Sequence, residues 1–237
     1  MKKLLLLLSF LLSTVSGYSG GMDWILKQKG LLNETAELKI LQWQDKTIAF
    51  IGMMHLGKPQ FYNDVKRKVD SLQQEGFTVF YEGSFQRRQR KELDTLYVLK
   101  CRKLTGLDAT RFYSETVPFP EMIEKHQLVD QPDYPELGVK EELAEGVDLK
   151  LKDLIMAYEQ QYRVIELAEC DYKSPLGQKY NCSKMGFGKT LTFQDEFIID
   201  KRNEYLVEHI KKSNSRKIVV LYGKAHYKGV RKLLNMG

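Results

Sequence analysis

Hydrophobic residues recur in three patterns near the start of this chain, and each pattern predicts a different element. Residues 38–52 alternate between polar and apolar and then run apolar, with one polar step between the two parts, which is typical of a β-hairpin. Residues 61–76 carry apolar side chains at helical spacing and end in glycine, so they predict a helix. The aromatic and β-branched run 77–82 predicts another strand, which ends at Glu82.

A strand, a helix and a second strand in this order predict a parallel pair. A crossover of this length joins parallel strands, and such connections are right-handed. His55 comes just after the first of these strands, and Glu82 ends the second. We therefore expect both side chains at the carboxyl ends of adjacent parallel strands, where open α/β sheets bind their ligands.

The rest of the chain predicts further elements around a proline-rich middle. The apolar pattern predicts helices at 22–28, 88–104, 151–170, 194–212 and 228–235, and a strand at 217–222. Apolar residues recur throughout the proline-rich stretch 116–149, which predicts a structured connection over the site. The fold class is therefore α/β, with a mixed, mostly parallel central sheet flanked by helices.

Two of the four histidines, His55 and His226, stand in the same local frame. In each case an apolar run is followed by Gly, two residues and His, with another Gly shortly after. This repetition predicts two partial repeats that meet at one site. Two imidazoles and the Glu82 carboxylate are the three ligands that a catalytic divalent metal needs, and a metal held in this way activates water for amide or ester hydrolysis. The alternative is that both histidines cap strand ends by hydrogen bonding.

Composition excludes several classes of function. With 237 residues, of which 43% are hydrophobic, the chain can bury one sizeable core and form one domain of about 200 residues. The formal net charge is +6, but the basic residues are interspersed with acidic residues and do not alternate with aromatic ones. The charge pattern therefore does not predict a nucleic-acid partner. The segment 183–190 resembles a phosphate-binding loop, but Ser183 replaces its first glycine and no strand precedes it, which argues against an NTPase.

The amino-terminal segment is typical of a secretory signal peptide. Lys2 and Lys3 precede the apolar run 4–12, and small residues follow, so we place the signal at residues 1–17 and a single mature domain at 18–237. Cleavage leaves a charge of 6 − 2 = +4 and no stable membrane span. The mature chain is expected to be periplasmic or secreted. The Lys-Lys and Leu-rich leader favours a bacterium, although glycosylation acceptor motifs at Asn33 and Asn181 leave a eukaryotic source open.

The three cysteines allow at most one intramolecular disulfide. Cys170 and Cys182 are the nearest pair, and the sequence leaves open whether they are bridged. No pair has C-x-x-C spacing, so neither a thiolate zinc site nor a redox dithiol is supported.

Two blocks of the chain, residues 48–83 and 200–230, resemble the TraB, PrgY and GumN family, which is related to the Tiki proteins. The first block has a strand, Gly-x-x-His, a helix and a strand that ends in Glu; the second has Arg and Asn on a helix, then a strand, Gly-x-x-His and Gly. Together they cover about seventy residues. The middle of the chain has a Gln-containing segment followed by an Asp-containing segment, which is similar to the middle of family members of this length.

The resemblance implies roles for five residues. His55, Glu82 and His226 would be catalytic and would hold a divalent metal, with manganese or cobalt favoured and zinc or iron possible. Arg202 and Asn203 would bind the substrate, with Arg202 assisting catalysis. Tiki proteins are regarded as metal-dependent proteases, which implies a peptidase-like hydrolase acting on a peptide or small molecule. Related erythromycin esterases are thought to need no metal, and pheromone-shutdown members imply a third alternative, a protein that sequesters its ligand.

Four polar residues have structural alternatives. Arg202 could clamp a substrate carboxylate or stabilise an oxyanion, or it could simply pair with Glu82 or a surface acid. Asn203 could orient Arg202 or a water, or it could be solvated. Asp148 is expected to cap the helix that follows it, without a catalytic role. His126 lies in the proline-rich middle and could shield the site, but it is expected at the surface.

Overall fold

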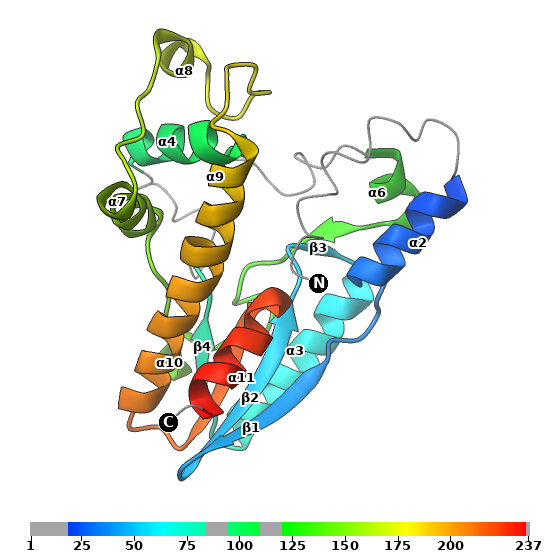
Figure 1. Cartoon of the computed structure of the whole chain (residues 1–237). Coiled ribbons are helices and arrows are strands. Elements are labelled where there is room, and N and C mark those ends of the chain that lie inside the picture. The colour runs from blue at the N-terminus through cyan, green and yellow to red at the C-terminus, as the bar shows by residue number, and fades with distance from the viewer. Residues whose placement is uncertain (1–18, 84–93, 110–119, 236–237) are drawn as a thin grey trace.

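The structure is a computed structural model that describes residues 19–83, 94–109 and 120–235. The predicted signal peptide, residues 1–17, lies outside these residues. A five-stranded sheet in the order β1-β2-β7-β4-β6 forms the centre of the protein (Figure 1). Its strands are β1 (Leu38–Trp43), β2 (Lys46–Met53), β7 (Lys217–Gly223), β4 (Thr78–Tyr81) and β6 (Ala144–Gly146).

The hairpin and the mostly parallel sheet are confirmed. β1 runs antiparallel to β2, and the pairs β2·β7, β7·β4 and β4·β6 are parallel. One expectation is wrong: β2 and β4 are not neighbours, because β7 lies between them and pairs with both. The chain therefore returns at its end to fill the gap that the first strand-helix-strand unit leaves open. This insertion places the strand of the second histidine motif next to the strand of the first and next to the strand of Glu82.

Helices cover both faces of the sheet because the central strands are apolar on both sides. In β2, Ala49 and Ile51 face α3 (Pro59–Gln74), whereas Ile48 and Phe50 face the opposite layer. That layer consists of α10 (Arg202–Lys212) and α11 (Tyr227–Asn235), which lie in front of the sheet in Figure 1.

Several predicted helices are confirmed, but one is wrong. The confirmed helices include α2 (Ser19–Lys29), α3 and α11, and α4 (Thr95–Thr105) confirms the later part of the segment 88–104. The predicted helix 151–170 is two helices, α7 (Leu151–Gln161) and α8 (Glu169–Lys173). The chain leaves the helical path so that Ile165 can be buried among α4 and α7 side chains, and the Ile165 N–H then bonds to the Glu159 carboxylate over 2.8 Å.

The predicted helix 194–212 is helical throughout but not uniformly α-helical. α9 (Phe187–Thr192) leads into a π-helix, η4 (Phe193–Lys201), which continues as α10. Phe193 and Phe197 of the π-helix are fully buried against Tyr158 of α7. The wider helical turn directly precedes Arg202 and Asn203.

Short elements complete the fold. They are β3 (Leu56–Gly57), which pairs with β5 (Val129–Asp130), the helix α6 (Pro120–His126), and the 3₁₀ turns η3 (Glu141–Leu143) and η5 (Lys224–His226). Within the described ranges, no helix combines the length and the apolar character that a membrane crossing requires.

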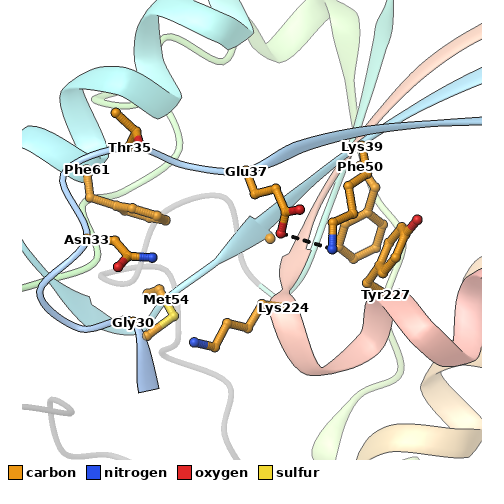
Figure 2. A pocket seen from close by; sticks show the side chains of 11 residues that line it. Gly30, Asn33, Thr35, Glu37, Lys39, Phe50, Met54, Phe61, Lys224 and Tyr227 are labelled. Carbon is orange, nitrogen blue, oxygen red and sulfur yellow. Dashed lines mark ion pairs between the residues drawn. The ribbon is translucent and has the colours of Figure 1, made fainter. Parts of the chain in front are cut away.

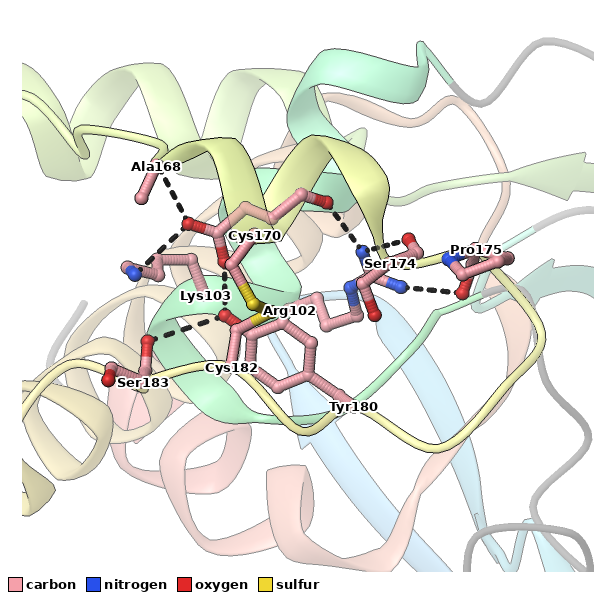
Figure 3. Close-up of a disulfide and its surroundings, with 10 residues drawn as sticks. Arg102, Lys103, Ala168, Cys170, Ser174, Pro175, Tyr180, Cys182 and Ser183 are labelled. Carbon is pink, nitrogen blue, oxygen red and sulfur yellow. Dashed lines mark hydrogen bonds and ion pairs between the residues drawn. A yellow bond between two sulfur atoms is a disulfide. The ribbon is translucent and has the colours of Figure 1, made fainter.

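Cys170 and Cys182 form a disulfide, which settles the pairing that the sequence left open (Figure 3). The loop that it closes lies on α4, where the fully buried Arg102 donates hydrogen bonds to the carbonyls of Asp171, Ser174 and Pro175 at 2.7–3.0 Å. The remaining cysteine, Cys101, is buried, and burial raises the pKa of its thiol to about 11. The third thiol is therefore a core side chain and not a nucleophile.

Replacing both Cys170 and Cys182 with serine is expected to lower the free energy of unfolding by about 3 kcal/mol, because the bridge restricts the unfolded chain. Urea unfolding of the oxidised wild type and the double variant measures the difference. A matched control is the wild type unfolded with a reductant, which should behave like the double variant. Equal stability of all three samples would contradict the prediction.

Candidate functional site

The carboxyl edge of the sheet brings together the ends of β2, β7 and β4. Met53 of β2 is opposite Gly223 of β7, and the Glu82 N–H donates to the Leu221 carbonyl of β7 over 3.2 Å. His55 and His226 therefore follow neighbouring strands, and Glu82 follows the next one. The predicted meeting of the three strand ends at one edge is confirmed.

Glu82 is held by Arg202, which reaches the sheet edge from the first turn of α10. Arg202 Nη2 donates to Glu82 Oε1 over 2.7 Å. The same guanidinium donates from Nε and Nη2 to the two oxygens of Asp148, each over 2.7 Å. All three side chains are only 10–12% exposed, so this is a buried cluster with two carboxylates and one guanidinium. Of the roles proposed for Arg202, the ion pair with Glu82 is confirmed.

Backbone and tyrosine groups fix the position of Glu82 further. The Gly223 N–H donates to Glu82 Oε2 over 2.6 Å, and the Tyr134 hydroxyl donates to the Glu82 carbonyl over 2.7 Å. Burial alone would raise the pKa of Glu82, but the charges of Arg202 and the nearby histidines and the Gly223 N–H lower it to about 2. Glu82 is therefore ionised at neutral pH and fixed in place.

His226 is buried and oriented by Asn203. Its Nδ1 lies 2.8 Å from Asn203 Oδ1, and its ring packs edge-on against Tyr222 with centroids 5.2 Å apart. With Asn203 Oδ1 as the acceptor, this hydrogen bond requires the proton on Nδ1, and Nε2 then carries the lone pair of the neutral ring. Burial lowers the pKa of His226 to about 4, even though Glu82 opposes this effect. His226 is therefore a neutral imidazole with a basic nitrogen at neutral pH.

Asn203 itself is buried, which the sequence did not favour. It is fully buried between α10 and α11, and Gly229 of α11 makes room for it. A Cβ on Gly229 would lie 2.2 Å from Asn203 Nδ2 and 3.0 Å from Asn203 Cγ. The glycine that follows the second histidine motif is therefore required by the Asn203 side chain that orients His226.

Gly229→Ala is accordingly expected to displace Asn203 and to destabilise the fold by about 1–3 kcal/mol, as overpacking of a core does. Gly188→Ala is the matched control, because Gly188 is also helical and a Cβ added to it would meet no atom within 4 Å. There alanine is expected to be neutral or to stabilise the helix by up to about 1 kcal/mol. Thermal unfolding of both variants measures the contrast, and equal effects would contradict it.

The lowered pKa of His226 predicts that the protein loses stability in acid. A group whose folded pKa lies below its unfolded value stabilises the fold above the unfolded pKa and loses that contribution as the pH falls. For His226 this window runs from 6.5 down to about 4 and corresponds to about 3 kcal/mol. Glu82 extends the loss from 4.5 down to about 2.

Urea unfolding at pH 7, 5.5 and 4 measures this loss. His226→Gln, which cannot titrate, is expected to show a smaller pH dependence than the wild type across this range. The same pH dependence in both proteins would contradict the assignment. The other three histidines are present in both proteins, so the difference in pH dependence reports on His226.

The fit of these residues to a three-ligand metal centre is incomplete. Both Glu82 oxygens already accept hydrogen bonds, from Arg202 and from the Gly223 N–H. Across residues 19–83, 94–109 and 120–235, no group of three or more His, Cys, Asp or Glu side chains is arranged to hold a metal ion. His55 is exposed, and its carbonyl accepts from the Gln131 N–H over 2.9 Å. As arranged, His55, Glu82 and His226 do not form such a centre, and the metal remains a prediction of the sequence.

A pocket of about 160 Å³ opens beside the two histidine motifs (Figure 2). Gly52 and Met54 of the first motif and Lys224 of the second motif line it. The segment that leads into β1 supplies the opposite wall. The pocket is separated from Glu82 by β7, so it adjoins the buried cluster but does not contain it.

Sequence reasoning missed two members of the buried cluster around Glu82. Asp148 was expected only to cap the next helix; its Oδ1 does accept from the Leu149 N–H, but α7 begins later and Asp148 also binds Arg202. Tyr134 was not singled out at all. A search for carboxylates that follow sheet strands would have found Asp148, but β6 has only three residues and no apolar pattern. His126 lies away from the site and bonds to Asp23 over 2.7 Å.

The resemblance to the TraB, PrgY and GumN family rests on the two histidine motifs and the residues around them. The observed sheet places these motifs side by side, but a shared edge of a sheet does not by itself identify a family. The assignment therefore stays an interpretation of the sequence. No protein-family model matches this chain, and neither a curated protein nor a solved structure matches it.

Proposed function

We propose that this chain is a hydrolase of ester or peptide bonds that activates water at His226. The observation that carries the proposal is the 2.8 Å contact between His226 Nδ1 and Asn203 Oδ1, because a proton held on Nδ1 by this contact would leave Nε2 as the proton acceptor. A neutral, oriented imidazole is the commonest general base in enzymes. In this proposal the two strand and Gly-x-x-His units are partial repeats that supply the two sides of one site.

The roles of the other residues follow from their contacts. Water near Nε2 loses a proton to His226 as its oxygen attacks the carbonyl carbon, and the leaving group takes that proton when the bond breaks. Asn203 is a positioning residue, since it holds the ring in one tautomer. Glu82 stabilises the imidazolium that forms, because it is ionised, and Arg202 with Asp148 holds Glu82 in place.

A metal-dependent form of the same reaction is the second candidate. It is favoured by the unprotonated Nε2 of His226, because histidine ligands usually bind a metal through one nitrogen while the other nitrogen bonds to an orienting oxygen, as Asn203 provides here. A bound divalent ion would supply an activated water at neutral pH. His226 and His55 would hold it, and Glu82 would become the third donor only by giving up its contact with Arg202 or with the Gly223 N–H.

The test is a screen of aryl esters and short peptides with the purified mature chain, with and without a chelator and with added manganese, cobalt or zinc. Turnover that survives chelation supports the metal-free route. Turnover that needs an added metal, together with metal content that disappears in a His55→Ala, His226→Ala double variant, supports the second candidate. Absence of turnover in every condition would overturn the hydrolase proposal and favour a ligand-sequestering protein.

A further inference from the structure

The pocket in Figure 2 combines a positive charge with apolar walls. Its charged lining side chains are Glu37, Lys39 and Lys224. Glu37 and Lys39 neutralise each other in an ion pair of 2.9 Å. Among the residues that the structure describes, no carboxylate forms an ion pair with Lys224. The pocket therefore offers a net positive charge to a ligand.

Lys224 is held in place although it lacks an acidic partner among the described residues. Its ammonium donates a hydrogen bond to the Lys29 carbonyl, and a Cβ on Gly30 would lie 2.9 Å from Lys224 Nζ. Gly30 has a φ of 80°, so glycine suits this turn for its conformation as well as for space. In Figure 2 the Lys224 side chain extends across the pocket toward this turn.

The rest of the lining is suited to an apolar group. Phe50 and Phe61 are almost fully buried, and Met54 and Tyr227 stand beside them. A volume of about 160 Å³ is smaller than the roughly 300–1,000 Å³ of clefts that enclose a whole drug-sized ligand. The pocket is therefore the right size for one terminal group of a longer molecule.

The pocket is connected to the proposed reaction site through the end of β7. Gly223 donates its N–H to Glu82, the next residue is Lys224 in the pocket, and His226 follows two residues later. A Cβ on Gly52 would lie 2.9 Å from Lys224 Cβ, so β2 and the second motif are in direct contact here. Lys224 in the pocket wall and His226 therefore belong to the same short turn, η5, which follows β7.

We propose that the pocket binds the carboxylate-bearing, apolar end of the substrate, and that Lys224 recognises its negative charge. This inference rests on the proposed function, because it assigns a substrate class to the same site. The substrate class is a peptide or acyl amino acid that ends in an apolar residue with a free carboxylate. Lys224 is then a specificity-determining residue, and its hydrogen bond to the carboxylate is charge-assisted.

Binding of two probes tests the proposal without requiring turnover. N-acetyl-L-leucine carries the carboxylate, and N-acetyl-L-leucinamide has the same shape without the charge. Calorimetric titration of the mature chain is expected to show at least about tenfold tighter binding of the acid, as loss of a hydrogen bond to a charged group implies. Equal affinities, or no binding of the acid, would overturn the proposal.

Three variants separate recognition from folding. Lys224→Met keeps the aliphatic stem that packs on Gly52 and is expected to abolish the preference for the acid, whereas Lys224→Arg is expected to retain it. Lys228→Met is the matched control, since it removes the same charge from an exposed residue of α11 that does not line the pocket. A preference that survives in Lys224→Met would overturn the assignment. If the wild type prefers the acid but hydrolyses no substrate, only the proposed function is overturned.

Discussion

Replacing His226 with glutamine is expected to lower kcat by about 10²- to 10⁴-fold on any ester or peptide that the protein hydrolyses. Glutamine is polar and close in size, but it has no basic nitrogen to take a proton from water. In the proposed mechanism, the contact of His226 Nδ1 with Asn203 leaves Nε2 as the proton acceptor. The effect should therefore fall on kcat and not on KM.

His209→Gln is the matched control for this measurement. His209 lies on α10, bonds through Nδ1 to the Tyr205 carbonyl over 2.8 Å and is half-buried at a distance from the sheet edge. We expect it to retain the activity of the wild type. Circular dichroism of both variants checks that the fold is intact. If His226→Gln turns over substrate as fast as His209→Gln, the base assignment is wrong.

Arg202→Met is expected to produce the largest loss of stability, about 3–5 kcal/mol. The substitution leaves two buried carboxylates, Glu82 and Asp148, without the guanidinium that binds both of them. Burial of a charge without a partner costs desolvation free energy, and no attraction to an opposite charge offsets that cost. Burial alone would lower the pKa of Arg202, but the two carboxylates raise it above its ordinary value, so the guanidinium stays charged.

Arg216→Met is the control for Arg202→Met. Arg216 forms an ion pair with Asp45 at 3.1 Å, but these side chains are 79% and 61% exposed. Exposed pairs contribute at most about 1 kcal/mol, so this variant should unfold at nearly the same urea concentration as the wild type. Adding Glu82→Gln and Asp148→Asn to Arg202→Met should recover part of the loss, because it removes the unpaired charges. An Arg202→Met variant no less stable than Arg216→Met would refute the prediction.

The main elements of the sheet could be predicted from the sequence because their signals are local. β2, β4 and β7 are short, mainly apolar runs, and such runs are typical of strands buried on both faces. The position of β7 between β2 and β4 could not be predicted in this way. A parallel sheet can take up a late strand at an edge or in a gap, and local periodicity does not distinguish the two.

The residues of the candidate site also divide into those that the sequence identified and those that only the structure revealed. His55, Glu82 and His226 were identified from motif and position, and Arg202 and Asn203 from the family resemblance. The structure brings all of them except His55 together around the end of β7. Asp148 and Tyr134 come from the proline-rich middle, where a three-residue edge strand leaves no hydrophobic pattern to read. Their contacts join residues far apart in the chain, so only the folded chain defines them.

The sequence by itself determined an α/β protein with a mostly parallel sheet and polar residues at the ends of its strands. Periodicity and composition decide this much, because burial of apolar side chains selects the element type locally. The tertiary structure alone decided that Arg202 pairs with two carboxylates and that Asn203 lies within hydrogen-bond distance of His226. It also decided that Lys224 faces a pocket. These outcomes depend on which helix packs over which strand end, and the hydrogen bonds and ion pairs of buried groups are set by that packing.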